Sequence, residues 1–401
     1  MRQLFALLLA ITVLAFVRSA RAEEEAKPAA SAPTVDLYTI GPHGDFPSRL
    51  GHAILCVREA GHDDAEHGRC YDYGVPESED MIKVGYTAMR GVPSFRPIVV
   101  GEPTVLHFFK ETQGRQVEKQ RLPLSPEETQ KLVTSLDREV KDEVAYAYHP
   151  YWANCTTKIR DQIDAATGGK LHGVPTTLPR TTLREYFEEG HSGHIGILTA
   201  MAIYLGEGND HVPTAWEAML LPAVLRDAVT ERFGVKPEQL SERMAVILPT
   251  SRALGKIAIF VTALGLFLVV RLCARKNRVP LALGIVGGVL GTLGLSIEVF
   301  SALVKWSEIS HNWALALFFP WDVALPWLAR SKHAKLLPLY LKARIGLAVG
   351  MAILEIANVA HQPMLPLVAL VIFPCVGLLG ALKEREVATE SAAAPPAAKA
   401  A

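Results

Sequence analysis

The chain has 401 residues, half of them hydrophobic, and its 41 lysines and arginines balance 41 aspartates and glutamates, so the formal net charge is zero. No basic patch interleaved with aromatic residues precedes residue 250, which argues against nucleic acid as a partner. The long uncharged runs all lie in the second half, so the sequence predicts a polar N-terminal domain followed by a membrane domain.

Residues 1–22 have the pattern of a secretory signal peptide, in which Arg2 precedes an apolar run and Ala20-Arg21-Ala22 offers a cleavage site. An uncleaved N-terminal anchor is the alternative. No cysteine follows the cleavage site, so the chain is not expected to be a lipoprotein itself. Residues 23–34 contain no large apolar residue and are expected to form a disordered spacer.

Residues 35–250 are expected to form one α+β domain. Its predicted strands cover residues 35–40, 53–57, 70–74, 104–109 and 116–122. Its predicted helices begin at Ser125, cover 156–166, follow Thr181, and cover 195–204 and 215–233. Strands come first and helices follow, a pattern typical of segregated α+β domains.

Cys155 lies in the first turn of the predicted helix 156–166, behind the favourable N-cap Asn154. A helix N-terminus carries about half a positive charge, which lowers the pKa of a thiol placed there and favours the nucleophilic thiolate. An inert buried thiol is the alternative interpretation. The pattern indicates a thiol enzyme if a histidine lies nearby.

Five cysteines are present, and two of them, Cys273 and Cys375, fall in or beside predicted membrane spans. Of the remaining three, Cys56 and Cys70 lie on neighbouring predicted strands and could form a disulfide. Cys155 would then be the free thiol.

His52, preceded by Gly51, begins a predicted strand about a hundred residues before Cys155. A histidine on a strand facing a cysteine on a helix is the geometry of papain-like enzymes, here in reversed order. If Cys56 pairs with Cys70, Asp72 lies on the same sheet face as His52 and diagonal to it, within reach as an orienting carboxylate. A core histidine and a solvated Asp72 are the alternatives.

Five apolar runs, at residues 254–270, 280–304, 313–329, 345–360 and 363–382, approach the roughly 20 residues that a bilayer span needs. They predict a transmembrane domain of about five helices over residues 254–382. Basic residues gather between the first and second runs and between the third and fourth, which places residues 23–253 outside the cytoplasm. Run 313–329 contains two prolines and Asp322 and could re-enter instead of crossing. Residues 383–401 are expected to form a disordered cytoplasmic tail.

Glu298, Asp322 and Glu355 fall inside or near the spans, where a carboxylate is costly and commonly functional. Glu298 and Glu355, with His311 and Asn312 in the outer loop, could line a cavity beneath the outer domain. A structural role in helix pairing is the alternative.

Two histidine groups, His62 with His67 and His191 with His194, lie in polar loops without the ligand spacing of a defined metal site. No metal or other cofactor is expected.

Several spaced motifs together resemble the N-terminal periplasmic domain of the Lnb family, bacterial lipoprotein intramolecular transacylases. The motifs are residues 46–53, Tyr71-Asp72-Tyr73-Gly74, Tyr148 to Arg160 around Asn154-Cys155, Arg184, and Leu205-Gly206 with Asp210. In the membrane half, His311-Asn312 and Pro320 also resemble the family.

The resemblance implies a circularly permuted papain-like (NlpC-like) fold, similar to lecithin retinol acyltransferase, with Cys155 as nucleophile and His52 as base. Asp72 stands where the family more often has asparagine. The implied reaction moves an acyl chain from the diacylglyceryl group of a lipoprotein to the N-terminal amine, giving a lyso-lipoprotein. The implied location is the bacterial inner membrane, with the catalytic domain in the periplasm and diacylated lipoproteins and bilayer lipid as partners.

Three classes of function remain open from the sequence. An acyltransferase accounts for the thiol, the histidine, the outward placement and the spans together. A cysteine peptidase or amidase acting on cell-wall peptide would use the same pair of residues but needs the spans only as an anchor. A non-enzymatic membrane scaffold leaves Cys155 unexplained.

Arg160 and Arg184 could hold a carboxylate or a substrate carbonyl, although structural ion pairs are the alternative.

Overall fold

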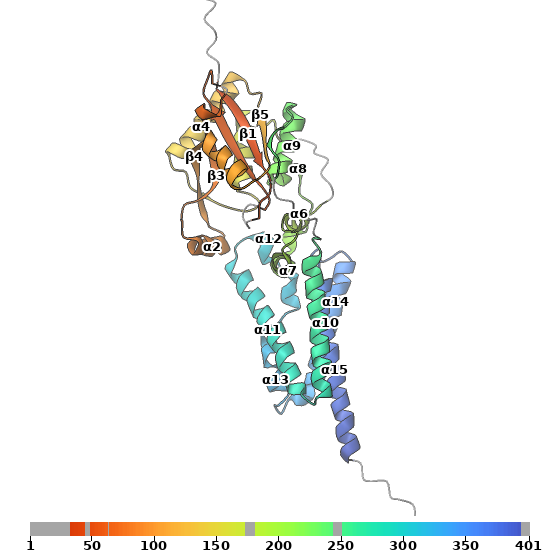
Figure 1. Cartoon of the computed structure of the whole chain (residues 1–401). Coiled ribbons are helices and arrows are strands. Elements are labelled where there is room, and N and C mark those ends of the chain that lie inside the picture. The colour runs from red at the N-terminus through yellow and green to blue at the C-terminus, as the bar shows by residue number, and fades with distance from the viewer. Residues whose placement is uncertain (1–32, 45–48, 63, 173–180, 244–250, 394–401) are drawn as a thin grey trace, which may run out of the picture.

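The computed structural model describes residues 33–44, 49–62, 64–172, 181–243 and 251–393, and it places a sheet domain at one end of a bundle of long helices (Figure 1). The predicted signal peptide, residues 23–32 of the predicted spacer and motif residues 46–48 lie outside the described residues.

The sheet has seven antiparallel strands in the order β6-β4-β3-β2-β1-β5-β7. The strands are β1 Thr34–Ile40, β2 His52–Arg58, β3 Gly68–Pro76, β4 Ser94–Gly101, β5 Val117–Arg121, β6 Tyr146–Ala147 and β7 Glu238–Ser241. The predictions for β1, β2, β3 and β5 are confirmed, whereas β4, β6 and β7 were not predicted. The predicted strand 104–109 is wrong, because this segment forms α3, Glu102–Leu106, and the π-helical turn His107–Thr112. Val105 and Phe109, four residues apart, both pack against the sheet from one helical face.

The helices of this domain are α2 Met81–Met89, α3, α4 Pro126–Lys141, α5 Cys155–Ala166, α6 Leu183–Gly190, α7 Ile195–Tyr204, α8 Ala215–Ala218 and α9 Pro222–Phe233. The predicted N-terminus of α4 is confirmed, with a complete capping box between Ser125 and Glu128. The predicted helix 215–233 is divided into α8 and α9, because the chain is extended at Leu221 and restarts at Pro222. α2 was not predicted.

The sheet is covered on both faces. α4, α5 and α9 pack on one face, where Leu55, Tyr71 and Ile159 belong to one buried cluster. α3 and the π-helical turn cover the other face around Cys56 and Cys70. These two cysteines are direct partners in the β2–β3 register and form a disulfide, which leaves Cys155 free.

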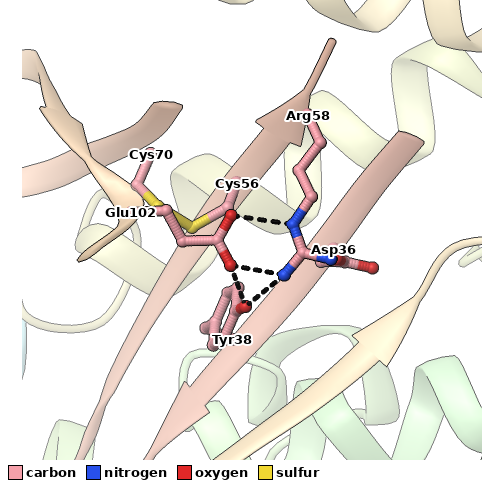
Figure 2. The surroundings of a disulfide bond; sticks show 6 residues. All are labelled: Asp36, Tyr38, Cys56, Arg58, Cys70 and Glu102. Carbon is pink, nitrogen blue, oxygen red and sulfur yellow. Dashed lines mark hydrogen bonds and ion pairs between the residues drawn. A yellow bond between two sulfur atoms is a disulfide. The ribbon is translucent and has the colours of Figure 1, made fainter. Parts of the chain in front are cut away.

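Beside the disulfide, a buried charge cluster ties α3 to the sheet (Figure 2). Arg58 donates to the two carboxylate oxygens of Glu102 at 2.9 and 2.6 Å and lies 3.5 Å from Asp36. The Tyr38 hydroxyl also donates to Glu102. Buried charges require such partners. Arg58 is the last residue of β2 and His52 the first, so this cluster supports the end of the strand opposite to the histidine.

The bundle contains four helices that are long and apolar enough to cross a membrane among the residues described, instead of the expected five. They are α10 Leu254–Arg275, α11 Val279–Leu303, α14 Leu337–Ile356 and α15 Leu365–Ala393. The third predicted span instead forms short pieces: 3₁₀ turns at Trp313–Ala316 and Pro320–Ala324, followed by α13, Leu325–Leu328.

This broken segment, residues 313–328, runs alongside α11, because glycines on α11 let the backbone of the segment approach the helix closely. A Cβ added to Gly291 would lie 2.6 Å from the Val323 amide nitrogen, and one added to Gly294 would lie 2.8 Å from the Phe319 carbonyl carbon. Non-helical backbone at membrane depth is tolerated where protein covers it. The segment therefore crosses the bundle without forming a spanning helix.

Asp322 holds this segment in place. It forms a buried ion pair with Arg344 of α14 at 2.9 Å, and Arg344 also donates to the Leu317 carbonyl at 2.5 Å and lies over the Phe319 ring at 4.3 Å. Asp322 is thus a structural residue.

At the far end of the bundle, Arg271 of α10 pairs with Glu384 of α15 at 2.7 Å. The basic residues that follow Arg271 therefore lie away from the sheet domain (Figure 1), in agreement with a periplasmic sheet domain. The disorder predicted for residues 383–401 is wrong up to Ala393, because α15 continues to that residue. Residues 394–401 lie outside the described part.

Candidate active site

Cys155 is the first residue of α5, and its position is fixed by the cap before it. The Asn154 side chain accepts hydrogen bonds from the backbone N–H groups of Thr156 and Thr157, both at 2.9 Å. The Asn154 side-chain amide donates to the Leu220 carbonyl at 3.1 Å, which ties the cap to the chain before α9. The predicted supporting role of Asn154 therefore has a clear geometric basis.

The structure brings Cys155, His52 and Asp72 together. His52 Nδ1 lies 3.1 Å from Cys155 Sγ, and His52 Nε2 lies 3.1 Å from Asp72 Oδ1. The Gly74 backbone N–H donates to the same Asp72 oxygen at 2.7 Å. Gly74 leaves room for the imidazole, because a Cβ there would lie 2.8 Å from His52 Cε1. The three side chains thus have the alignment that a nucleophile, a base and an orienting group need in nucleophilic catalysis, and they are the candidates for these roles.

The charges in this trio stabilise one another. Burial lowers the pKa of His52, but the Asp72 carboxylate and the Cys155 thiolate outweigh burial and raise it to about 10. Burial raises the pKa of Cys155, and the charge of His52 and its hydrogen bond bring it below the ordinary value. The pKa of Asp72 is likewise lowered, against burial, by His52 and by the Gly74 N–H. The lowered pKa of Cys155 and the raised pKa of His52 both favour a thiolate–imidazolium pair.

Tyr148 forms one wall of the site. Its ring stacks on Phe95 with the centroids 4.4 Å apart, and its backbone N–H donates to the Pro93 carbonyl at 2.8 Å. Burial and the nearby Cys155 charge raise the pKa of the Tyr148 phenol, so its hydroxyl remains a proton donor. A hydroxyl donor within the electrostatic influence of Cys155 suits an oxyanion site.

Two other motif residues, Tyr73 and Arg160, have structural partners. The Tyr73 hydroxyl donates to Glu139 at 2.9 Å, on the sheet face covered by α4. Arg160 donates to the Trp216 carbonyl at 2.9 Å, and its guanidinium lies 3.9 Å from the centre of the Trp216 ring. Both residues hold helices in place around Cys155.

Arg184 is buried and forms an ion pair with Asp210, with contacts of 2.5 and 2.9 Å. It also donates to the Leu205 and Gly206 carbonyls at 2.9 and 3.0 Å, which caps the end of α7. The motif residues Arg184, Leu205, Gly206 and Asp210 thus form one structural unit.

His311 and Asn312 lie where the sheet domain meets the bundle. The His311 carbonyl accepts from the Glu207 N–H at 2.7 Å. The Asn312 side chain donates to the Ile203 carbonyl at 2.8 Å and accepts from Gln362 at 2.9 Å. Asn312 therefore joins three segments of the chain.

A cavity of about 600 Å³ lies among α7, α10, α11 and α15. Its lining is mostly apolar and includes Ile203, Ile259, Leu293 and Leu370. We expected Glu298 and Glu355 to line a cavity beneath the outer domain, but neither residue is in the lining of this one. Glu298 is exposed on α11, and Glu355 accepts from the Met364 N–H at 2.9 Å, which closes the turn before α15.

Sequence reasoning missed Glu308. This buried residue of α12, Ser307–Ser310, accepts from Trp152 Nε1 at 2.5 Å and lies 3.6 Å from His149 Nε2. Its backbone carbonyl accepts from Asn209 at 2.6 Å. Glu308 thus holds the loop that leads into Asn154 and Cys155. No local pattern could show this, because Trp152 and Glu308 are 156 residues apart.

His62, Asp64 and His67 are exposed, and their ligand atoms lie within 4.8 Å of one another. The spacing of these residues along the chain did not indicate a metal site, yet the fold brings the three side chains together. An exposed group of this kind also occurs without an ion, and it lies apart from the catalytic trio.

The candidate nucleophile, base and carboxylate all fall within residues 21–188, which match the family model described as the Lnb N-terminal periplasmic domain. No curated protein and no solved structure matches the chain. The permuted papain-like arrangement therefore stays a prediction. The protein is a membrane protein with a periplasmic domain, and the N-terminal part of the chain is a member of the Lnb N-terminal periplasmic domain family.

Proposed function

We propose that the protein is a membrane-bound, cysteine-dependent acyltransferase of the bacterial inner membrane. It moves an acyl chain from the diacylglyceryl group of a lipoprotein to that lipoprotein's N-terminal amine. The observation that carries the proposal is the alignment of Cys155, His52 and Asp72 within 3.1 Å contacts, in an Lnb-family domain joined to a membrane bundle.

In the first half-reaction, the Cys155 thiolate attacks the carbonyl carbon of a lipid ester. The oxyanion accepts hydrogen bonds from the Cys155 backbone N–H and from Tyr148. The ester C–O bond breaks, and the His52 imidazolium donates its proton to the departing glyceryl oxygen. The products are an acyl thioester on Cys155 and a free hydroxyl on the glyceryl group.

In the second half-reaction, the neutral α-amine of the lipoprotein's N-terminal cysteine attacks the thioester carbonyl. His52, now neutral, takes the proton from the nitrogen, and the Cys155 thiolate leaves. The resulting lipoprotein carries an N-acyl chain and one acyl chain on its glyceryl group. The enzyme returns to its thiolate–imidazolium state, so no cofactor is consumed.

The membrane half supports a lipid substrate over a soluble peptide. Trp152, three residues before the nucleophile, bonds directly to Glu308 of the membrane half. The mostly apolar cavity of about 600 Å³ beneath the domain lies within the roughly 300–1,000 Å³ range of small-molecule sites and suits an acyl chain. A peptidase or amidase would use the same trio without needing either feature.

The test is mass spectrometry of the N-terminal lipopeptide from a lipoprotein co-expressed with the chain, in a bacterial host without other N-acylation. We expect an N-acyl, S-monoacylglyceryl peptide in place of the diacylglyceryl form. Unchanged diacylglyceryl peptide, together with cleaved cell-wall peptides, would favour the peptidase alternative.

We expect Glu308→Ala to reduce acyl transfer by about tenfold to a hundredfold, because a misplaced catalytic loop costs that much even when the chemical groups remain. Glu308→Gln keeps an oxygen acceptor for Trp152 and should lose much less. Both variants are measured as rates of N-acyl product formation at equal amounts of folded protein. Equal activity of Glu308→Ala and the parent would remove Glu308 from the positioning of Cys155.

A further inference from the structure

The connection between β3 and β4 contains α2, whose composition does not suit exposure to water. None of its nine residues is buried. Ile82 is 85% exposed, Met81 65% and Tyr86 55%, and Met89 and Val92 are also exposed. Asp80 caps the helix by accepting from the Ile82 and Lys83 N–H groups at 2.9 and 3.2 Å, so it is a regular helix with an uncovered apolar surface.

The position of α2 beside the end of a spanning helix indicates the kind of surface against which its apolar residues pack. In Figure 1, α2 projects from the sheet domain toward the bundle and lies level with the domain-side end of α11. Just after α2, a Cβ placed on Gly91 would lie 3.1 Å from Lys305 Cβ and 3.3 Å from the Trp306 ring. These two residues come just after Val304, the C-cap of α11, at the height where a spanning helix leaves the hydrocarbon and where tryptophan commonly lies.

We propose that α2 is an interfacial helix that inserts its apolar residues into the outer leaflet beside α11. Its apolar residues would lie in the acyl boundary, while the exposed basic residues Lys83 and Arg90 reach the lipid phosphates. The partner is the bilayer that already surrounds the bundle. The proposal rests on the spanning helices and is independent of the reaction assigned to Cys155.

Insertion of α2 would also orient the site. β3 carries Asp72 and Gly74 just before α2, and β4 carries Phe95, which stacks on Tyr148, just after it. The membrane-inserted helix therefore joins the two strands that bear the carboxylate and the wall of the site. It would hold the sheet domain so that Cys155 lies near the level of the lipid esters.

The test uses the full chain in nanodiscs containing a phospholipid with a photoactivatable group high in its acyl chain. After illumination and digestion, we expect lipid adducts on the peptide containing residues 81–92 and none on the peptide containing α4, which serves as the internal control. This measurement needs no substitution, so it cannot fail through misfolding. Adducts confined to α10, α11, α14 and α15, with none on residues 81–92, would overturn the proposal.

A pair of variants sharpens the result. Ile82→Asp should lower the adduct yield on residues 81–92 several-fold, because a charge at the most exposed apolar position opposes insertion. Val144→Asp changes an exposed apolar residue in the turn after α4 and should leave the yield unchanged. Equal yields from the parent and Ile82→Asp would contradict insertion through this face.

Discussion

Replacing Cys155 with serine should abolish acyl transfer, with a rate loss of about 10⁴-fold or more. A serine hydroxyl keeps the size of the side chain but stays protonated at neutral pH, so His52 would face a weak nucleophile. The intermediate can be trapped with a diacyl-lipopeptide whose α-amine is acetylated, because this substrate can donate an acyl chain but cannot accept it. The parent protein should then gain the mass of one acyl group, in a form that neutral hydroxylamine removes.

Cys273→Ser is the matched control, since Cys273 is a free cysteine outside the sheet domain. It should retain both the adduct and the transfer activity. An acyl adduct that persists in Cys155→Ser, or normal N-acylation by that variant, would reject Cys155 as the nucleophile.

Replacing His52 with alanine should lower the alkylation rate of Cys155 at pH 7 by about 10- to 100-fold, because the thiol loses the cation that lowers its pKa. In the parent, the lowered pKa of Cys155 keeps the thiolate present below the ordinary thiol range. The raised pKa of His52 keeps the imidazolium up to about pH 10. Alkylation should therefore persist into mildly acidic solution, whereas acyl transfer should fall as pH rises toward 10 and His52 loses its proton.

The measurement uses iodoacetamide and mass spectrometry of the Cys155 peptide, in a background where Cys273 and Cys375 are serine. Asp72→Ala should reduce the rate less than His52→Ala, because Asp72 acts through the imidazole. A parent protein that becomes reactive only above pH 8 would contradict the thiolate–imidazolium pair. Equal activity of Asp72→Ala and the parent would remove Asp72 from the site.

Much of the site could be predicted because its signals are local. The N-cap at Asn154 and the apolar period of α5 determine where Cys155 lies on its helix. Pairing Cys56 with Cys70 then determines that Asp72 lies diagonal to His52 on the sheet, and the observed register agrees. Alternation in a strand has a period of two residues, so one correct pair orients every side chain near it.

Other features depended on contacts between distant segments. Residues 104–109 have an apolar pattern that fits either a strand or a helix. They form a helix because Val105 and Phe109 pack together over the Cys56–Cys70 disulfide. Run 313–329 is apolar enough to span a membrane. Its prolines interrupt the helix, and Gly291 and Gly294 of α11 let its non-helical backbone pack closely against α11, a contact that the sequence does not show.

The sequence by itself determined the two-part organisation, the membrane character of the second half, and which three residues are the candidates for the catalytic trio. Only the tertiary structure decided that Arg160 and Arg184 serve as structural residues, that Glu308 holds the nucleophile loop, and that α2 projects toward the membrane. The physical reason is that periodicity and capping are read within one turn or one strand. The partner of a buried charge or an exposed apolar face is set by segments that meet only after the chain has folded.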